Sequence, residues 1–147
     1  MDARDVDLRN LTYRRFVELG RAPSAGEVAA TASRDPADVL AAWRRLHDAH
    51  ALVLNATGTA IRMANPFSGV PTPYRVQAAG CSWHANCAWD AFGICAALGT
   101  DGRIDTSCPD CGEAIAIDVR GHRAGDETLR FHCLVPAARW WEDIVFT

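Results

Sequence analysis

Three prolines and a glycine within residues 65–73 constrain the fold of this chain more than any other feature. Proline has no backbone N–H and fixes its own φ angle, so this segment cannot continue a regular helix. We therefore expect residues 1–64 to form one unit and residues 65–80 to form a Pro-rich linker with a first strand. Residues 81–147 would then form a second unit. A chain of 147 residues can bury one main core.

The first unit has the pattern of three helices followed by a hairpin. Apolar residues recur at helical spacing through residues 7–20, and a Ser-x-x-Glu capping box at residues 24–27 opens a second helix. Pro36 stands at the first position of a third helix, which carries an apolar stripe. Strands at residues 51–54 and 60–64 then flank a turn. This order predicts a winged-helix-like module.

The remainder predicts a small mixed or antiparallel sheet packed on one central helix, so the fold class is α+β. The central helix is expected at residues 86–98. Four tryptophans are expected in the core, and Trp89 is expected to anchor the central helix on the sheet; the four are Trp83, Trp89, Trp140 and Trp141. The other elements are expected as strands at residues 74–78, 81–83, 103–106, 114–119 and 129–133, a short helix at 136–141 and a strand that begins at 144.

A thiol and a carboxylate, Cys87 and Asp90, lie three residues apart at the start of this helix. Residues at that spacing share a helix face. A thiolate binds soft metals and a carboxyl group can deliver a proton, so the pair suits cleavage of a bond to a soft metal. The pKa of Cys87 should fall near a helix N-terminus, although an anionic Asp90 would push it back up. We expect Cys87 to be the fastest thiol to alkylate.

The alternative to a catalytic role is that Cys87 is an inert core thiol and that Asp90 is a solvated helix residue. Cys95 lies two helical turns beyond Cys87, too far to share a metal with it, and is expected in the core.

Four separated blocks of the sequence resemble the alkylmercury (organomercurial) lyase family and occur in that family's order. The resemblance implies that Cys87 takes the mercury of an R–Hg bond and that Asp90 helps to move a proton to the departing carbon. It also implies an organomercurial or other soft-metal compound as the small-molecule partner, with no organic cofactor. The N-terminal unit is compatible with the helical lead-in domain of that family. The four blocks are residues 65–68, 85–94, 107–113 and 136–147.

The second catalytic cysteine of that family has no match in this chain. Its position would fall just past Thr147, whereas Cys133 precedes the last block and does not match it. The unit at residues 81–147 is therefore expected to be a lyase-like domain that is C-terminally incomplete, or one without the two-thiol mechanism. We expect it to capture organomercurials through Cys87 but to turn over poorly.

Cys108 and Cys111 form a C-x-x-C pair with a proline inside it and a glycine after it, a pattern typical of a zinc knuckle. Cys81 and His84 would complete a Cys₃His site, and His84 is the one histidine expected as a ligand. We nevertheless expect no structural zinc, because a closed site there would block the approach to Cys87. The C-x-x-C pair stays a candidate for holding mercury, or a tight turn.

The alternative function is a winged-helix metal-responsive regulator or a zinc-stapled binding module. Arg44 and Arg45 of the third helix could meet DNA phosphates, but interspersed acidic residues leave no basic face, so DNA binding is disfavoured. The sequence has no apolar run of membrane-spanning length and no signal-peptide pattern at its start. We therefore expect a cytoplasmic protein with reduced thiols and no membrane partner. The sequence does not predict an oligomeric state.

Overall fold

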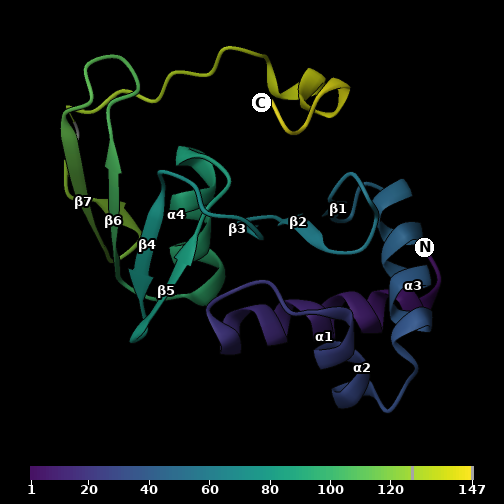
Figure 1. Ribbon diagram of the computed structural model, residues 1–147. Helices are drawn as coiled ribbons and strands as arrows, with labels where there is room; N and C mark the ends of the chain where they lie inside the picture. The colour runs from purple at the N-terminus through teal and green to yellow at the C-terminus, as the bar shows by residue number, and fades with distance from the viewer. Residues whose placement is uncertain (127, 147) are drawn as a thin grey trace.

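The computed structural model describes residues 1–126 and 128–146. Three helices open the chain: α1 (Ala3–Leu19), α2 (Ala25–Ala32) and α3 (Pro36–Asp48). A small sheet follows, and then a larger sheet with one helix, α4. Figure 1 shows the three helices and the larger sheet on opposite sides of the molecule, with the small sheet and α4 between them.

Side-chain caps set the starts of the first three helices. The carboxylate of Asp2 accepts a hydrogen bond from the Arg4 N–H (3.3 Å), so α1 begins four residues before its apolar pattern does. The predicted Ser-x-x-Glu capping box opens α2, with both of its reciprocal hydrogen bonds present. The carboxylate of Asp35 accepts from the Ala37 N–H (2.7 Å) and Pro36 takes the first turn of α3, as predicted.

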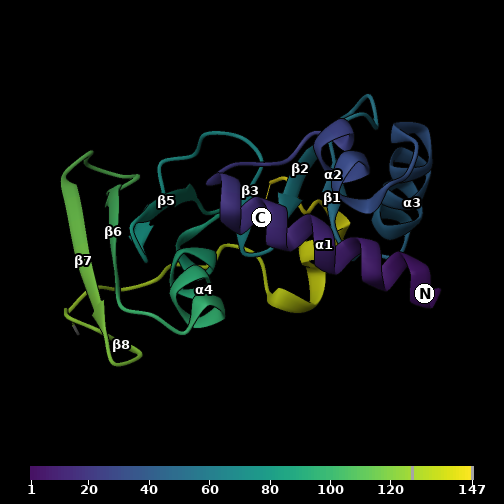
Figure 2. The same cartoon turned by 90° about the horizontal axis from the view of Figure 1, so that it is seen from below.

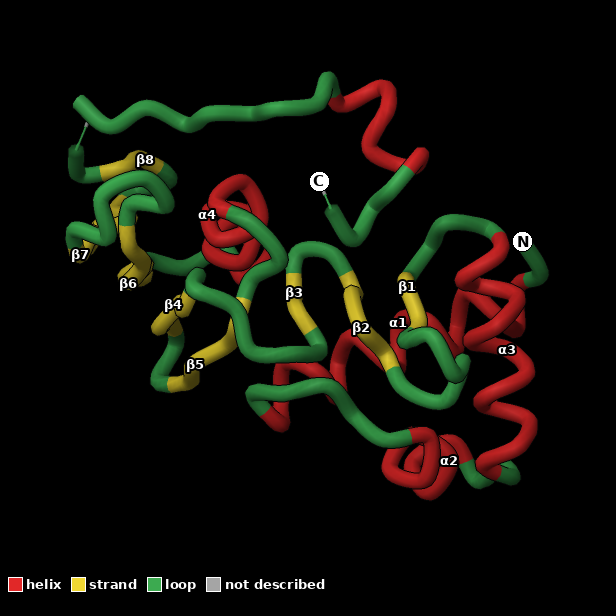
Figure 3. Tube along the Cα trace, turned by 45° about the horizontal axis from the view of Figure 1, so that its top comes forward, coloured by secondary structure: helices red, strands yellow, loops and turns green. Residues whose placement is uncertain are grey.

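The small sheet has three antiparallel strands in the order β1-β2-β3, which lie side by side in Figure 3. They are β1 (Val53–Leu54), β2 (Ile61–Ala64) and β3 (Phe67–Ser68). The third strand lies in the segment predicted as a linker, which is thus not free of regular structure. Gly69 permits this, because a Cβ there would lie 2.1 Å from the backbone oxygen of Ile61. The helices and hairpin occur in the predicted order, while the winged-helix assignment stays a prediction.

The larger sheet is antiparallel, with strand order β5-β4-β6-β7-β8, and α4 (Ala88–Leu98) packs against β4 and β6. The α+β class is confirmed. The strand predicted at residues 129–133 is wrong, since those residues form no strand. The chain instead turns back at once after β7, and β8 pairs with the end of β7. The five strands are β4 (Arg75–Ala78), β5 (Cys81–His84), β6 (Gly102–Ser107), β7 (Ala114–Arg120) and β8 (Arg123–Ala124).

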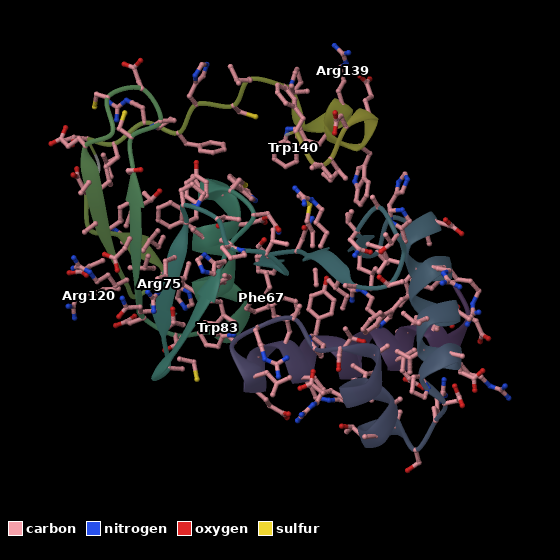
Figure 4. The ribbon with its side chains drawn as sticks, viewed as in Figure 1. Phe67, Arg75, Trp83, Arg120, Arg139 and Trp140 are labelled. Carbon is pink, nitrogen blue, oxygen red and sulfur yellow. The ribbon has the colours of Figure 1, made fainter. Side chains whose placement is uncertain are left out.

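One core joins the helices to both sheets. The ring of Phe67 on β3 lies 5.3 Å from that of Phe16 on α1 and 6.0 Å from that of Trp83 on β5, measured between centroids. The indole N–H of Trp83 donates to the backbone oxygen of Phe16 (3.3 Å), which satisfies its one polar atom. The expectation of a buried Trp83 is confirmed, and Figure 4 shows Phe67 and Trp83 where these elements meet. Truncating such an aromatic costs about 3–5 kcal/mol.

Residues 128–146, here called the C-terminal segment, cross back over the molecule from the larger sheet toward α3 (Figures 1 and 2). The segment contains a 3₁₀ helix, η1 (Ala137–Glu142), close to the predicted short helix. The strand predicted to begin at residue 144 is not formed by residues 144–146. Its last residue, Thr147, lies outside the described residues. No described helix is long and apolar enough to cross a membrane.

Aromatic contacts hold the C-terminal segment at both ends. Trp89 on α4 faces Phe131, with ring centroids 6.4 Å apart, and Trp141 stacks on His50 at 4.2 Å. Trp89 is 63% exposed and Trp141 is 40% exposed, so the prediction that they lie in the core is wrong. Trp140 is only half-buried, and its indole N–H donates within the segment. Trp89 and Trp141 are exposed because they pack on residues at the surface and not on the larger sheet.

Candidate functional site

Cys87 and Asp90 meet at the first turn of α4, although not as two residues within the helix. Cys87 is the N-cap residue, with an extended backbone (φ −151°, ψ −178°), and Asp90 lies in the first helical turn. The side chain of an N-cap residue faces the backbone N–H groups of the first turn. The Cys87 sulfur makes no full capping hydrogen bond, but the N–H groups of Trp89 and Asp90 lie close enough to favour its thiolate.

Both residues line a pocket of about 290 Å³ that the C-terminal segment covers. This volume is at the lower end of the range for small-molecule sites, which suits a compact ligand. Figure 4 shows Trp140 pointing from η1 toward the body of the molecule. One wall includes Met63, Asn65 and Tyr74, and the opposite wall includes Phe131, Trp140 and Ile144.

Burial raises the pKa of the Cys87 thiol, and this is the largest influence on it. The backbone N–H groups of Asp90 and Trp89 lower the pKa, whereas negative charge on Asp90 or Cys133 raises it further. The sequence left open the balance between the helix N-terminus and the Asp90 anion; in the structure desolvation outweighs the helix N-terminus. The Cys87 thiol is half-buried, and the cost of desolvating a thiolate favours its protonated form.

The pKa of Asp90 is also raised, chiefly by burial. One hydrogen bond opposes this shift, since the side-chain amide of Asn86 donates to Asp90 Oδ2 (2.9 Å). The same amide nitrogen lies 3.1 Å from Asn65 Oδ1 and 3.3 Å from the backbone oxygen of Phe67. Asn86 thereby ties the start of α4 to β3 and fixes the direction of the carboxyl group. Sequence reasoning gave Asn86 no role, although its place directly before Cys87 was a signal.

Cys133 lines the same pocket as Cys87. Its thiol donates to the backbone oxygen of Val135 (2.9 Å), and an anion at Cys133 would raise the pKa of Cys87 further. Its alignment with the family gave no reason to place it there. Cys133 and Cys87 are far apart in the sequence, so no local pattern predicts that they share a pocket. They do so because the C-terminal segment folds back over α4.

The four residues considered for a Cys₃His zinc site do not come together. Cys81 pairs with Ala78, which pairs with Gly102 at the start of β6, whereas Cys108 follows the end of β6. The six residues of β6 span roughly 20 Å at strand spacing. Figure 1 accordingly shows the β4–β5 and β6–β7 turns at opposite ends of the sheet.

The Nδ1 atom of His84 lies 3.1 Å from the Thr72 backbone nitrogen, so this atom is not placed to bind a metal. Among residues 1–126 and 128–146, no group of three side chains is placed to hold a metal ion. That the protein lacks structural zinc stays a prediction.

Cys95 is buried in α4, and the prediction of a core thiol is confirmed. Its sulfur packs against Gly102, where an added Cβ would lie only 2.7 Å away.

Comparison with known proteins gave a family match and a structural similarity. Residues 67–147, more than half of the chain, match the model of the alkylmercury lyase family. Among solved structures, the mercury-bound form of MerB2 is similar with a TM-score of 0.64 and 22% sequence identity. The similarity covers 86% of this chain and 60% of that chain, and at this identity it shows the fold alone. A comparison with curated proteins gave no match.

Proposed function

The chain belongs to the alkylmercury lyase family, and from this premise we propose that it captures organomercurials through Cys87 and cleaves their carbon–mercury bond with a proton from Asp90. One observation carries the proposal: a thiol and a carboxyl group of raised pKa share a single small pocket. Perturbed titratable groups that converge in a pocket are typical of catalytic sites.

Capture is a ligand exchange at mercury. The thiol Cys87–SH reacts with R–Hg–X to give Cys87–S–Hg–R, and the proton leaves with X as HX. Thiolate is a soft ligand that suits a soft metal. Burial disfavours the negatively charged thiolate of Cys87. A positive mercury centre that binds the sulfur neutralises this charge and so offsets the cost of burial. Binding of a soft cation at the Cys87 sulfur is thus favoured over loss of the thiol proton to water.

Cleavage then needs a proton at the carbon that leaves. Burial favours the protonated form of Asp90, which is a proton donor. Transfer of this proton to carbon breaks the C–Hg bond, releases R–H, and leaves Hg(II) on the Cys87 sulfur with Asp90 as a carboxylate. The Asn86 amide already donates to Asp90 Oδ2, so it holds the carboxyl group in place and stabilises the anion that forms.

The pocket walls suit a small apolar group R. Met63, Phe131 and Trp140 present apolar surface beside Cys87 and Asp90. The C-terminal segment covers this surface and limits the access of water. A methyl or phenyl substituent on mercury has the size and polarity that this lining accepts.

The alternative of a DNA-binding regulator loses support from the third helix. The guanidinium of Arg45 donates to both carboxylate oxygens of Asp5, at 2.8 and 2.7 Å. One of the two arginines considered for phosphate contact therefore already serves an ion pair between α1 and α3.

The direct test is a single-turnover reaction with phenylmercury at equimolar protein, with benzene measured by gas chromatography. We expect one benzene per chain at most without added thiol, followed by further release once a small thiol removes Hg(II) from Cys87. Protein that binds phenylmercury but releases no benzene above the protein-free control would contradict the lyase proposal.

A further inference from the structure

The turn between β6 and β7, residues 108–113, carries two cysteines that the pocket does not use. It lies at the end of the larger sheet away from the β4–β5 turn (Figure 1). Cys108 is half-buried and Cys111 is exposed. We call these residues the dithiol turn.

Backbone hydrogen bonds give the dithiol turn a defined shape. The Cys108 N–H donates to the Glu113 oxygen (2.8 Å), and the Gly112 N–H donates to the Cys108 oxygen (2.9 Å). Gly112 has a positive φ of 76°, a conformation that L side chains rarely adopt. Pro109 restricts the backbone just after Cys108. The two cysteines are therefore brought to one side of a closed turn and not left on a loose loop.

The sulfur of Cys108 has several hydrogen-bond donors near it. The thiol of Cys111 and the backbone N–H groups of Asp110 and Cys111 all point at the Cys108 sulfur and favour its thiolate. The Asp110 carboxylate opposes thiolate formation but would favour a bound cation. The turn thus offers a thiol of lowered pKa, a second, exposed thiol and a nearby carboxylate.

This donor set is too small for structural zinc, which takes four ligands from the protein. No third side chain that ligates metal joins the pair among the described residues. Two sulfurs with open sides instead match a thiophilic ion that is satisfied by two soft ligands, and mercury(II) is such an ion.

We propose that Cys108 and Cys111 form a mercury(II) site that is separate from the pocket of Cys87. Binding is an exchange without redox chemistry: Hg²⁺ replaces the two thiol protons, forms two S–Hg bonds and releases two H⁺. The site lies outside the pocket and does not depend on Cys87, so it holds inorganic mercury whether or not the pocket cleaves organomercurials.

The test removes the pocket thiol first. Cys87→Ser protein is reduced, mixed with one equivalent of HgCl₂ and an excess of a monothiol, and desalted, and its mercury is measured by elemental analysis. A dithiol outcompetes a free monothiol because its second sulfur is held close by. We expect about one mercury per chain, and a native mass gain of one Hg less two hydrogens.

Two further variants decide where this mercury is bound. Adding Cys108→Ser and Cys111→Ser should reduce retention at least about tenfold, since only monothiol binding remains. Adding Cys81→Ser and Cys133→Ser instead should leave retention unchanged, because these exposed cysteines are not in the turn. Loss of mercury in this control, or its retention in the first variant, would overturn the proposal, as would a Cys87→Ser chain that retains none.

A last comparison separates this site from the proposed lyase activity. With Cys87 intact, Cys108→Ser/Cys111→Ser should release benzene from phenylmercury in the first turnover as fast as the unaltered chain does. Failure of benzene release in both proteins would count against the pocket alone and leave the dithiol result standing.

Discussion

Cys87 in the pocket and Cys108 in the dithiol turn have similar backbone surroundings but opposite acidity. Backbone N–H groups lie near both sulfurs, at the start of α4 in one case and in a tight turn in the other. The pKa of Cys87 is nevertheless raised, and the pKa of Cys108 is lowered. Both residues are half-buried, but desolvation is the largest influence on the pKa of Cys87 and a minor one on the pKa of Cys108. Nearby donors therefore favour a thiolate only where water still reaches the sulfur.

This contrast divides the two sites by what they can select. Burial in the pocket favours the protonated thiol of Cys87. A ligand with a soft positive centre and an apolar group would offset this preference. The turn offers its thiolate to any thiophilic ion in solution. Under the two proposals, selectivity for organomercurials belongs to the Cys87 thiol in the pocket, and ready capture of free ions belongs to the dithiol turn.

The largest expected effect is that of Cys87→Ser on carbon–mercury cleavage. Loss of the soft ligand should slow benzene release in a single turnover by at least about a hundredfold, since removing a nucleophile disables the steps that follow it. Cys108→Ser is the matched control and should change the rate by less than about twofold. Equal losses in the two variants would show that the two thiols work together and are not separate sites.

The next effect is that of Asp90→Asn, which keeps an oxygen to accept the Asn86 hydrogen bond but has no acidic proton. Phenylmercury capture, measured by mass spectrometry, should be unchanged. Benzene release should fall by about 10²–10⁴-fold, the usual contribution of a general acid. A variant that loses capture as strongly as cleavage would assign Asp90 to binding of the metal and not to proton transfer.

The sequence predicted those parts of this site that depend on neighbours along the chain. Capping residues and apolar periodicity located α2, α3 and α4, and the three-residue spacing brought Cys87 and Asp90 together. Contacts between distant segments were missed. Cys133 reaches the pocket only because the C-terminal segment folds back, and the exposure of Trp89 follows from its contact with Phe131.

The direction of the Cys87 pKa shift could not be decided from the sequence, for a related reason. The direction of the shift depends on how deeply the C-terminal segment and residues 63–65 bury the thiol, which no local sequence pattern records. The Cys₃His grouping that the sequence allowed does not form, because the strand pairings place Cys81 at one end of the sheet and Cys108 and Cys111 at the other.

Alkylation rates test the contrast between the two thiols directly. The sequence favoured Cys87 as the fastest thiol, but the pKa shifts favour Cys108, because only the thiolate reacts. At pH 7, we expect Cys108 to react with iodoacetamide several-fold faster than Cys87, because a larger fraction of Cys108 is thiolate at that pH.

The pH dependence of the alkylation rate shows whether the pKa of each thiol is raised or lowered. A lowered pKa brings the thiolate fraction to its plateau at lower pH, so the rate at Cys108 should level off before that at Cys87. Peptide mass mapping after brief labelling measures both sites in one sample. Faster labelling of Cys87 at every pH would mean that the pocket opens in solution and removes the burial that raises its pKa.

The smallest expected effect is on stability, and it comes from Asp90. Its folded-state pKa is raised, so the folded protein binds a proton at Asp90 more readily than the unfolded chain does. Stability therefore falls as pH rises through the range between the unfolded and folded pKa values, and the penalty is fully present above the folded value. Asp90→Asn removes this penalty. At pH 7 the variant should be more stable by about 0.5–1 kcal/mol, or roughly 2–4 °C in Tm.

This gain should vanish below pH ~3, where an ordinary carboxyl is protonated in both states. Asp110→Asn in the dithiol turn is the matched control, since that exposed side chain is hydrated in both states and should shift stability by less than ~0.5 kcal/mol. Thermal unfolding followed by circular dichroism at several pH values measures both variants. If Asp90→Asn instead lowers Tm at every pH, the pocket holds the carboxylate through favourable contacts. The raised pKa, and with it the proton-donor role of Asp90, would then be wrong.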